Sequence, residues 1–200
     1  MAVRVKTAWF RKANEERSPE ERASVVAATL WKLADKAIDN LSRADYQIGT
    51  PERGYRILAE LLAFGLHYCD RRAYGLLADA ERLAFVQALG RRLAEVLQEN
   101  LRATVDDPAR GWSGEFIALL NRRSTEYAEF EFAGDAPGFP ALRYLGSQIR
   151  EQMAERDRPW VLDQVMDVEM PELLGTLKKA VDGVLAPGPA PSGRTAAAGQ

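Results

Sequence analysis

The stretch that decides the fold is ILAELLAFGLHYC, residues 57–69. In a helix, where each residue turns by about 100°, its apolar side chains surround almost the whole axis. A helix that is apolar all round is normally buried on every side. Upstream, Thr50 and Pro51 have the chemistry of a helix start. The sequence therefore predicts a mostly buried central helix over about residues 51–72.

The segments on either side of this stretch have apolar residues at helical spacing, with charged residues on the opposite face. They predict further helices over about 18–44, 78–105, 113–130, 142–153 and 158–185. Pro171 is expected to interrupt the last of these, and residues 134–140 have the composition of a loop. The expected fold is an all-α, single-domain bundle of six or seven helices.

Length and composition agree with one globular domain. The chain has 200 residues, of which 46% are hydrophobic and 28% are charged. Residues 18–186 form the predicted helical domain, and residues 1–17 form a basic amphipathic segment before it. Residues 187–200 contain only Pro, Gly, Ala and small or polar residues, so a disordered tail is expected there.

The charge balance indicates which classes of partner to expect, and the cysteine content indicates the cellular compartment. Lys and Arg total 27 against 29 Asp and Glu, which lacks the basic excess typical of nucleic-acid binders, so no nucleic-acid partner is expected. The single cysteine, Cys69, cannot form an internal disulfide, which favours a cytoplasmic location. The apolar stretch ending at Cys69 is too short to span a membrane. Weak peripheral membrane contact through residues 1–14 is a minor alternative.

Two polar residues interrupt the apolar central helix. Glu60 and His67 are seven residues apart, so they share one stripe at a spacing of about 10 Å along the axis. On the fourth predicted helix, Arg123 falls inside an apolar stripe and Glu126 lies on its edge. An isolated buried charge is costly, so we expect Glu60 to pair with Arg123, and His67 to meet either Glu126 or a backbone carbonyl. The four residues form either a structural network or a polar ligand pocket.

The sequence lacks the residue patterns that the familiar catalytic and metal sites require. The glycine-rich segment 111–114 has no lysine or strand–loop–helix setting for phosphate binding. Cys69 and His67 would point about 200° apart on one helix, which rules out a nucleophile pair. The sequence has one histidine and no nucleophile elbow, so no Ser-His-Asp triad can be inferred from it. One histidine is also too few for the di-metal pattern of helical bundles, and the spacing of Glu60 and His67 does not fit it. We therefore expect no catalytic residues, no metal and no cofactor.

The function that the sequence favours is a non-catalytic, cytoplasmic module for protein–protein interaction or regulation. Its partner is another protein or a second copy of the chain. The last helix is apolar on more than one face, and we predict an interaction surface made of Trp160, Val165, Met166 and Met170. The alternative is a small-ligand-binding bundle with an internal polar pocket around Glu60, His67, Arg123 and Glu126.

Overall fold

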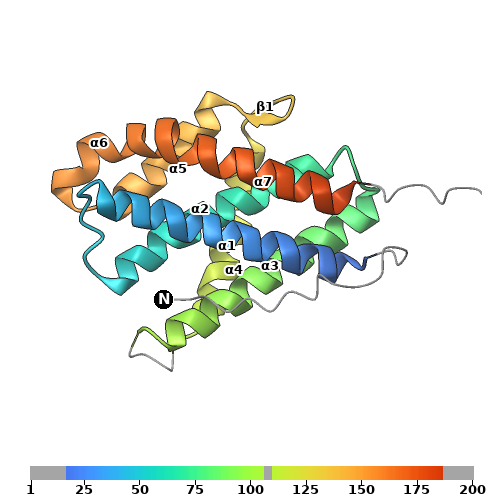
Figure 1. Cartoon of the computed structure of the whole chain (residues 1–200), viewed down its shortest axis with the longest axis horizontal. Coiled ribbons are helices and arrows are strands. Elements are labelled where there is room, and N and C mark those ends of the chain that lie inside the picture. Colours follow the sequence, from blue (N-terminus) through green and yellow to red (C-terminus); the bar gives the residue numbers. More distant parts are fainter. Residues whose placement is uncertain (1–16, 106–109, 187–200) are drawn as a thin grey trace, which may run out of the picture.

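The computed structural model describes residues 17–105 and 110–186 (Figure 1). The helices are α1 (Pro19–Arg43), α2 (Pro51–Ala73), α3 (Asp79–Arg102), α4 (Trp112–Ala128), α5 (Phe139–Gln152), α6 (Arg158–Asp163) and α7 (Met170–Leu185). A short 3₁₀ turn, Glu155–Asp157, precedes α6, and a π-helical segment, Gln164–Glu169, joins α6 to α7. The predicted all-α, single-domain bundle is confirmed.

The segments predicted at the two ends of the chain lie largely outside the residues that the structure describes. The predicted basic segment lies outside the described residues except for Arg17, and so do residues 1–14 with their predicted membrane contact. The predicted tail, residues 187–200, lies outside them as well. Across residues 17–105 and 110–186, no helix has the length and hydropathy needed to cross a bilayer.

The central helix α2 is the core of the bundle. Every residue from 57 to 69 is buried, and α2 packs against α1, α3, α4, α5 and α7. The predicted buried central helix is confirmed. Its start is the predicted one, because the Thr50 hydroxyl accepts a hydrogen bond from the backbone N–H of Arg53.

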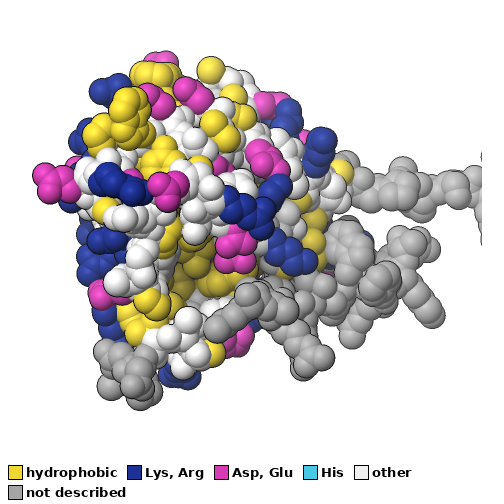
Figure 2. Space-filling view, turned by 60° about the vertical axis from the view of Figure 1, so that its left-hand side comes forward, with side chains coloured by type: hydrophobic (Ala, Val, Ile, Leu, Met, Phe, Trp, Pro, Cys, Tyr) yellow, Lys and Arg dark blue, Asp and Glu magenta, His cyan; other side chains and the backbone are white. Residues whose placement is uncertain are grey.

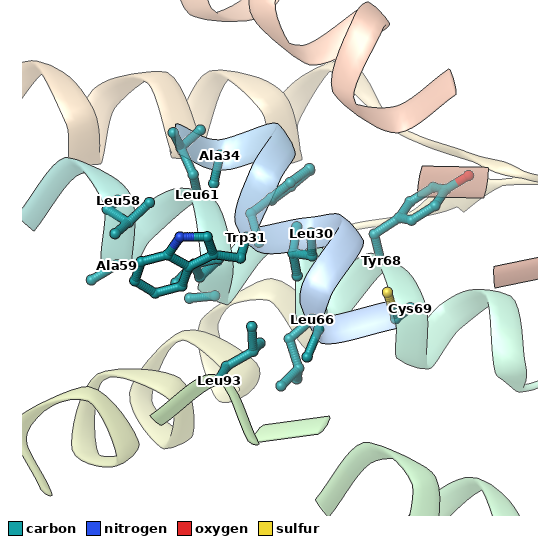
Figure 3. Packing of buried hydrophobic residues seen from close by; sticks show 14 of the residues in the cluster. Leu30, Trp31, Ala34, Leu58, Ala59, Leu61, Leu66, Tyr68, Cys69 and Leu93 are labelled. Carbon is teal, nitrogen blue, oxygen red and sulfur yellow. The ribbon is translucent and has the colours of Figure 1, made fainter. Parts of the chain in front are cut away.

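Helices α1 and α2 approach each other closely at one glycine. A Cβ atom on Gly65 would lie 2.3 Å from Cδ1 of Leu30, so no larger residue fits there unless the buried Leu30 side chain shifts. Leu30, Trp31 and Ala34 point from α1 into the core beside residues of α2 (Figure 3). The glycine thus allows two long helices to share a dense apolar interface.

The segment between α4 and α5 contains more structure than its loop composition indicated. Two short strands, β1 (Phe132–Ala133) and β2 (Ala136–Pro137), pair antiparallel around Gly134, whose φ of 61° suits a glycine. Helix α5 then begins at Phe139, with Pro140 in its first turn, where a missing N–H costs nothing. The loop predicted over residues 134–140 is therefore a hairpin followed directly by a helix.

The predicted interruption at Pro171 is confirmed in part: α6 ends at Asp163, a π-helical segment follows, and α7 begins at Met170 with Pro171 in its first turn, although the chain stays helical from Arg158 to Leu185. The π-helical segment ends just before the proline, and the Met170 N–H bonds to the carbonyl of Val165. This wider turn changes the hydrogen-bond register where the proline has no donor to contribute.

The π-helical segment also explains a four-residue rhythm in this helix. Buried side chains recur every four residues across this segment, at Val161, Val165 and Glu169. In an unbroken α-helix, steps of four residues would drift by about 40° each and leave the core face. The wider turn rotates less per residue and keeps these positions on one side.

Candidate functional site

Arg123 is the centre of the buried polar network. Its Nε and Nη2 atoms donate to Glu60 Oε2 and Oε1 at 2.7 and 2.6 Å, the fork geometry that suits an arginine and a carboxylate. Only 6% of the Arg123 side chain and 5% of the Glu60 side chain are exposed. The predicted pairing of Glu60 with Arg123 is confirmed.

The remaining donors of Arg123 are also occupied. Nη1 donates to Glu126 Oε2 at 2.6 Å and to the hydroxyl of Tyr144 at 3.1 Å. Nη2 makes a second hydrogen bond, to Gln148 Oε1, at 2.6 Å. A guanidinium has five N–H groups, and all five are accounted for here. The network thus joins α2, α4 and α5 without any group from outside the chain.

The electrostatics keep this cluster charged. Burial disfavours the charged guanidinium, but hydrogen bonds to Glu60 and Glu126 outweigh it and raise the pKa of Arg123 above its usual value. Burial likewise works against the Glu126 carboxylate, but its bond to Arg123 prevails and lowers the pKa of Glu126. The ion pair of Arg123 with Glu126 therefore persists at neutral pH.

His67 stands outside the network. Glu126 is bound by Arg123, and within the described residues no hydrogen bond or ion pair links it to His67, so that expected pairing is not made. The imidazole stacks on Tyr127 at 5.3 Å and meets Phe132 edge-on at 6.0 Å. Burial, together with the charge of Arg71, lowers the pKa of His67 to about 4. The ring is neutral at pH 7.

Sequence reasoning missed three residues at this site. Tyr144 and Gln148 are four apart on α5, so they lie on the same face, and this spacing was the available signal. Tyr127 follows Arg123 by four residues on the buried face of α4. Its hydroxyl is buried and has no hydrogen-bond partner among the described residues. Burial and the charge of Glu60 raise the pKa of Tyr127 well above its usual value.

The four residues of the predicted interaction surface separate into two groups. Val165, Met166 and Met170 are buried in the core of the monomer. Trp160 is 69% exposed. The isolated chain therefore does not present these four side chains as one surface, because the helix turns three of them inward. Sequence alone could not distinguish burial within the fold from burial in an interface.

A second buried carboxylate, Glu169, was not anticipated. It lies on the π-helical segment and accepts hydrogen bonds from Asn40 Nδ2 and Gln164 Nε2, both at 3.0 Å. A shallow depression beside it has a volume of about 10 Å³, room for about one water molecule, and is also lined by Lys36 and Glu172. Lys36 binds Glu172 directly, so the local charges are paired.

Neither metal-binding nor thiol chemistry finds support in the described part of the chain. It contains no group of three or more His, Cys, Asp or Glu side chains placed to hold a metal ion. Cys69 is a free, fully buried thiol, and burial raises its pKa. A thiol that stays protonated in an apolar core is a packing residue and a poor nucleophile.

No family model, no curated protein and no solved structure matches this chain.

Proposed function

We propose that this protein is a non-catalytic, cytoplasmic interaction module that associates with a second copy of itself through α6. The observation that carries the proposal is the 69% exposure of Trp160, which stands next to the fully buried Val161 on α6. Tryptophan is enriched at the centres of protein interfaces, where it contributes a large apolar area and few lost rotamers. The unpaired, buried thiol of Cys69 is compatible with a reducing compartment.

Trp160 has an apolar neighbour on the same side of the helix. Trp160 and Val168 are both exposed, and each directly precedes a residue of the buried stripe, Val161 and Glu169 respectively. They therefore project from one side, about two turns apart. Figure 2 turns the α6 end of the bundle toward the viewer and shows apolar side chains there among basic and acidic ones.

Rigid support favours Trp160 as an anchor. Val161, Val165 and Met170 have no exposed surface, so the helix below the indole is firmly packed. An anchor that is held in place before binding loses little entropy when the partner arrives. A two-fold arrangement would bring the Trp160 side chains of two copies to the same interface.

Sedimentation velocity over a wide concentration range tests this proposal. The expected result is a reversible dimer whose dissociation constant rises by about tenfold or more in Trp160→Ala, the loss typical of an interface anchor. Leu83→Ala is the matched control, because it removes an exposed apolar side chain from α3. A monomer at every concentration, or equal effects of the two substitutions, would contradict the proposal.

A second candidate function is the binding of a small polar ligand beside Glu60, His67, Arg123 and Glu126. The observation in its favour is the Tyr127 hydroxyl, which is buried without a partner among the described residues. The occupied donors of Arg123 favour a structural role for the network instead. Native mass spectrometry of the purified chain distinguishes the two: a retained mass supports a ligand, and the bare chain mass argues against it.

A further inference from the structure

The turn between α2 and α3 carries an exposed apolar surface built around one arginine. We call it the Arg71 corner and define it by Arg71, Tyr74, Leu76 and Leu83, all exposed. Tyr74 is 62% and Leu83 58% exposed, which is unusual for such large side chains within ten residues of each other. Figure 1 places this turn at the opposite end of the long axis from α6.

Aromatic rings hold the guanidinium of Arg71 in place. It lies 5.5 Å from the centre of the Phe132 ring and 5.8 Å from that of Tyr74. Arg82 contacts the same Tyr74 ring at 5.1 Å. Contacts of this kind fix both the tyrosine and the arginine at the surface.

Arg71 differs from the other arginines that lie over aromatic rings. Within the described residues, Arg82, Arg110 and Arg123 each lie over a ring and each also bind a carboxylate. Arg71 makes its two ring contacts, and no hydrogen bond or ion pair joins it to a carboxylate in the described part of the chain. The adjacent Asp70 is bound by Arg82, at 3.4 Å.

We infer that the Arg71 corner binds a segment of a partner protein in which a carboxylate stands next to large apolar side chains. The carboxylate complements the Arg71 guanidinium, whose fork geometry suits it, and the apolar side chains cover Tyr74, Leu76 and Leu83. This inference rests on the proposed function, that the chain acts by binding protein, but uses a surface separate from Trp160.

Negative charges near the Arg71 corner favour a partner segment with a single carboxylate over a polyanion. Asp79 and Glu81 are exposed on the first turn of α3, close to the corner in sequence. They would repel the continuous phosphate backbone of a nucleic acid or an anionic membrane surface. A single carboxylate flanked by apolar side chains can reach Arg71 without bringing further negative charge near them.

Fluorescence anisotropy with the full chain and three short labelled peptides tests the inference. The first has one Asp flanked by Leu residues, the second has Lys in place of the Asp, and the third has Ser in place of the Leu residues. The first should bind about tenfold more tightly than either of the others, since a charge-assisted bond and apolar burial each contribute about that factor. Its affinity should fall with added salt.

Substitutions in the chain test whether the peptide binds at the Arg71 corner. Arg71→Gln should weaken binding of the Asp–Leu peptide by about tenfold. Arg143→Gln is the matched control, because Arg143 is an exposed arginine on α5. Leu76→Ser should also weaken binding, which tests the apolar part of the corner. Thermal melts of the variants should match the wild type, because these side chains are at the surface.

Three results would overturn the inference. One is equal affinity for the Asp and Lys peptides, and another is an Arg71→Gln variant that binds like Arg143→Gln. The third is binding to phosphatidylserine vesicles in preference to the Asp–Leu peptide. If Trp160→Ala abolishes peptide binding while Arg71→Gln does not, association through α6 stands and the Arg71 corner is refuted.

Discussion

Two arginines of this protein have similar partners in different surroundings. In the core, Arg123 binds Glu60 and Glu126 and lies 5.6 Å from the centre of the Tyr144 ring. On the surface, Arg110 binds Glu115 through two nitrogens, at 2.8 and 3.0 Å, and Glu52 through a third, at 3.2 Å. It lies 3.9 Å from the centre of the Trp112 ring. Each arginine therefore joins two carboxylates and an aromatic ring.

Burial is what separates the two clusters. The Arg110 side chain is 30% exposed, against 6% for Arg123. A group near water that loses its partner is solvated again, whereas a buried one remains as an uncompensated charge. Two clusters with similar hydrogen bonds can therefore contribute differently to the stability of the fold, because the contribution of each bond depends on how deeply its partners are buried.

The largest expected effect comes from breaking the buried pair. Arg123→Ala and Glu60→Ala should each lower the free energy of unfolding by about 3–5 kcal/mol, because each leaves a buried charge without its partner. Urea denaturation monitored by circular dichroism measures this. Glu60→Gln should cost less, since the amide oxygen still accepts a hydrogen bond.

A double substitution sharpens the result. Glu60→Leu combined with Arg123→Met removes both charges and keeps apolar volume, so it should recover most of the stability lost in the single variants. Glu126 is 34% exposed and can turn to water. A double variant as unstable as Arg123→Ala would show that the pair contributes more than mutual neutralisation.

The next largest effect is the pH dependence of stability that we expect from His67, which lies beside the buried network of Arg123. The sequence contains one histidine, His67, and burial lowers its pKa from 6.5 to about 4. Between these values the unfolded chain binds a proton that the folded chain does not, so the free energy of unfolding falls as pH falls from 6.5 to 4. The loss should reach about 3 kcal/mol at the acidic end.

His67→Phe tests this directly, because it keeps a ring against Tyr127 and removes the titrating group. Denaturation curves at several values in this pH range should show a flatter dependence on pH than in the wild type. An identical pH dependence in both proteins would mean that other groups cause the acid sensitivity. The proton resonances of the single imidazole provide an independent measure of its pKa.

The smallest expected effect is that of Arg110→Ala, although Arg110 has as many carboxylate partners as Arg123. Glu52 and Glu115 are solvated in its absence, and Glu52 retains its bond to Arg56 at 3.0 Å. The melting temperature should therefore change far less than in Arg123→Ala. Comparable losses for the two variants would contradict the role assigned to burial. High salt should reduce the remaining difference from the wild type.

Most of the fold was readable from local signals. Helix α1 begins with a capping box, a pattern that can be read from Ser18 and Glu21 three residues later, and the side chain of each bonds to the backbone of the other. The helical register of residues 57–69 predicted the buried core. Pro171 indicated that the last helix is interrupted, but the π-helical form of the interruption could not be predicted, because a π-helical turn depends on how the long helix packs and has no clear signature in the sequence.

Part of the candidate functional site could be predicted from the sequence. Glu60 and Arg123 could be paired because each is a charge within an apolar stripe, and such misfits have few solutions. Tyr144 and Gln148 could not be assigned to Arg123, since polar residues at that spacing also occur on exposed faces. Val165, Met166 and Met170 could not be placed, because burial in the monomer and burial in an interface require the same side chains.

The amino-acid sequence was sufficient to predict the approximate ranges of most helices, which helix is central, and which two buried charges need a partner. These properties depend on neighbouring residues and on apolar periodicity, both of which are local. Only the tertiary structure decided that Arg123 uses all five of its donors, that His67 stacks on Tyr127, and that Trp160 faces outward. These depend on how distant helices pack: Glu60 and Arg123 are 63 residues apart.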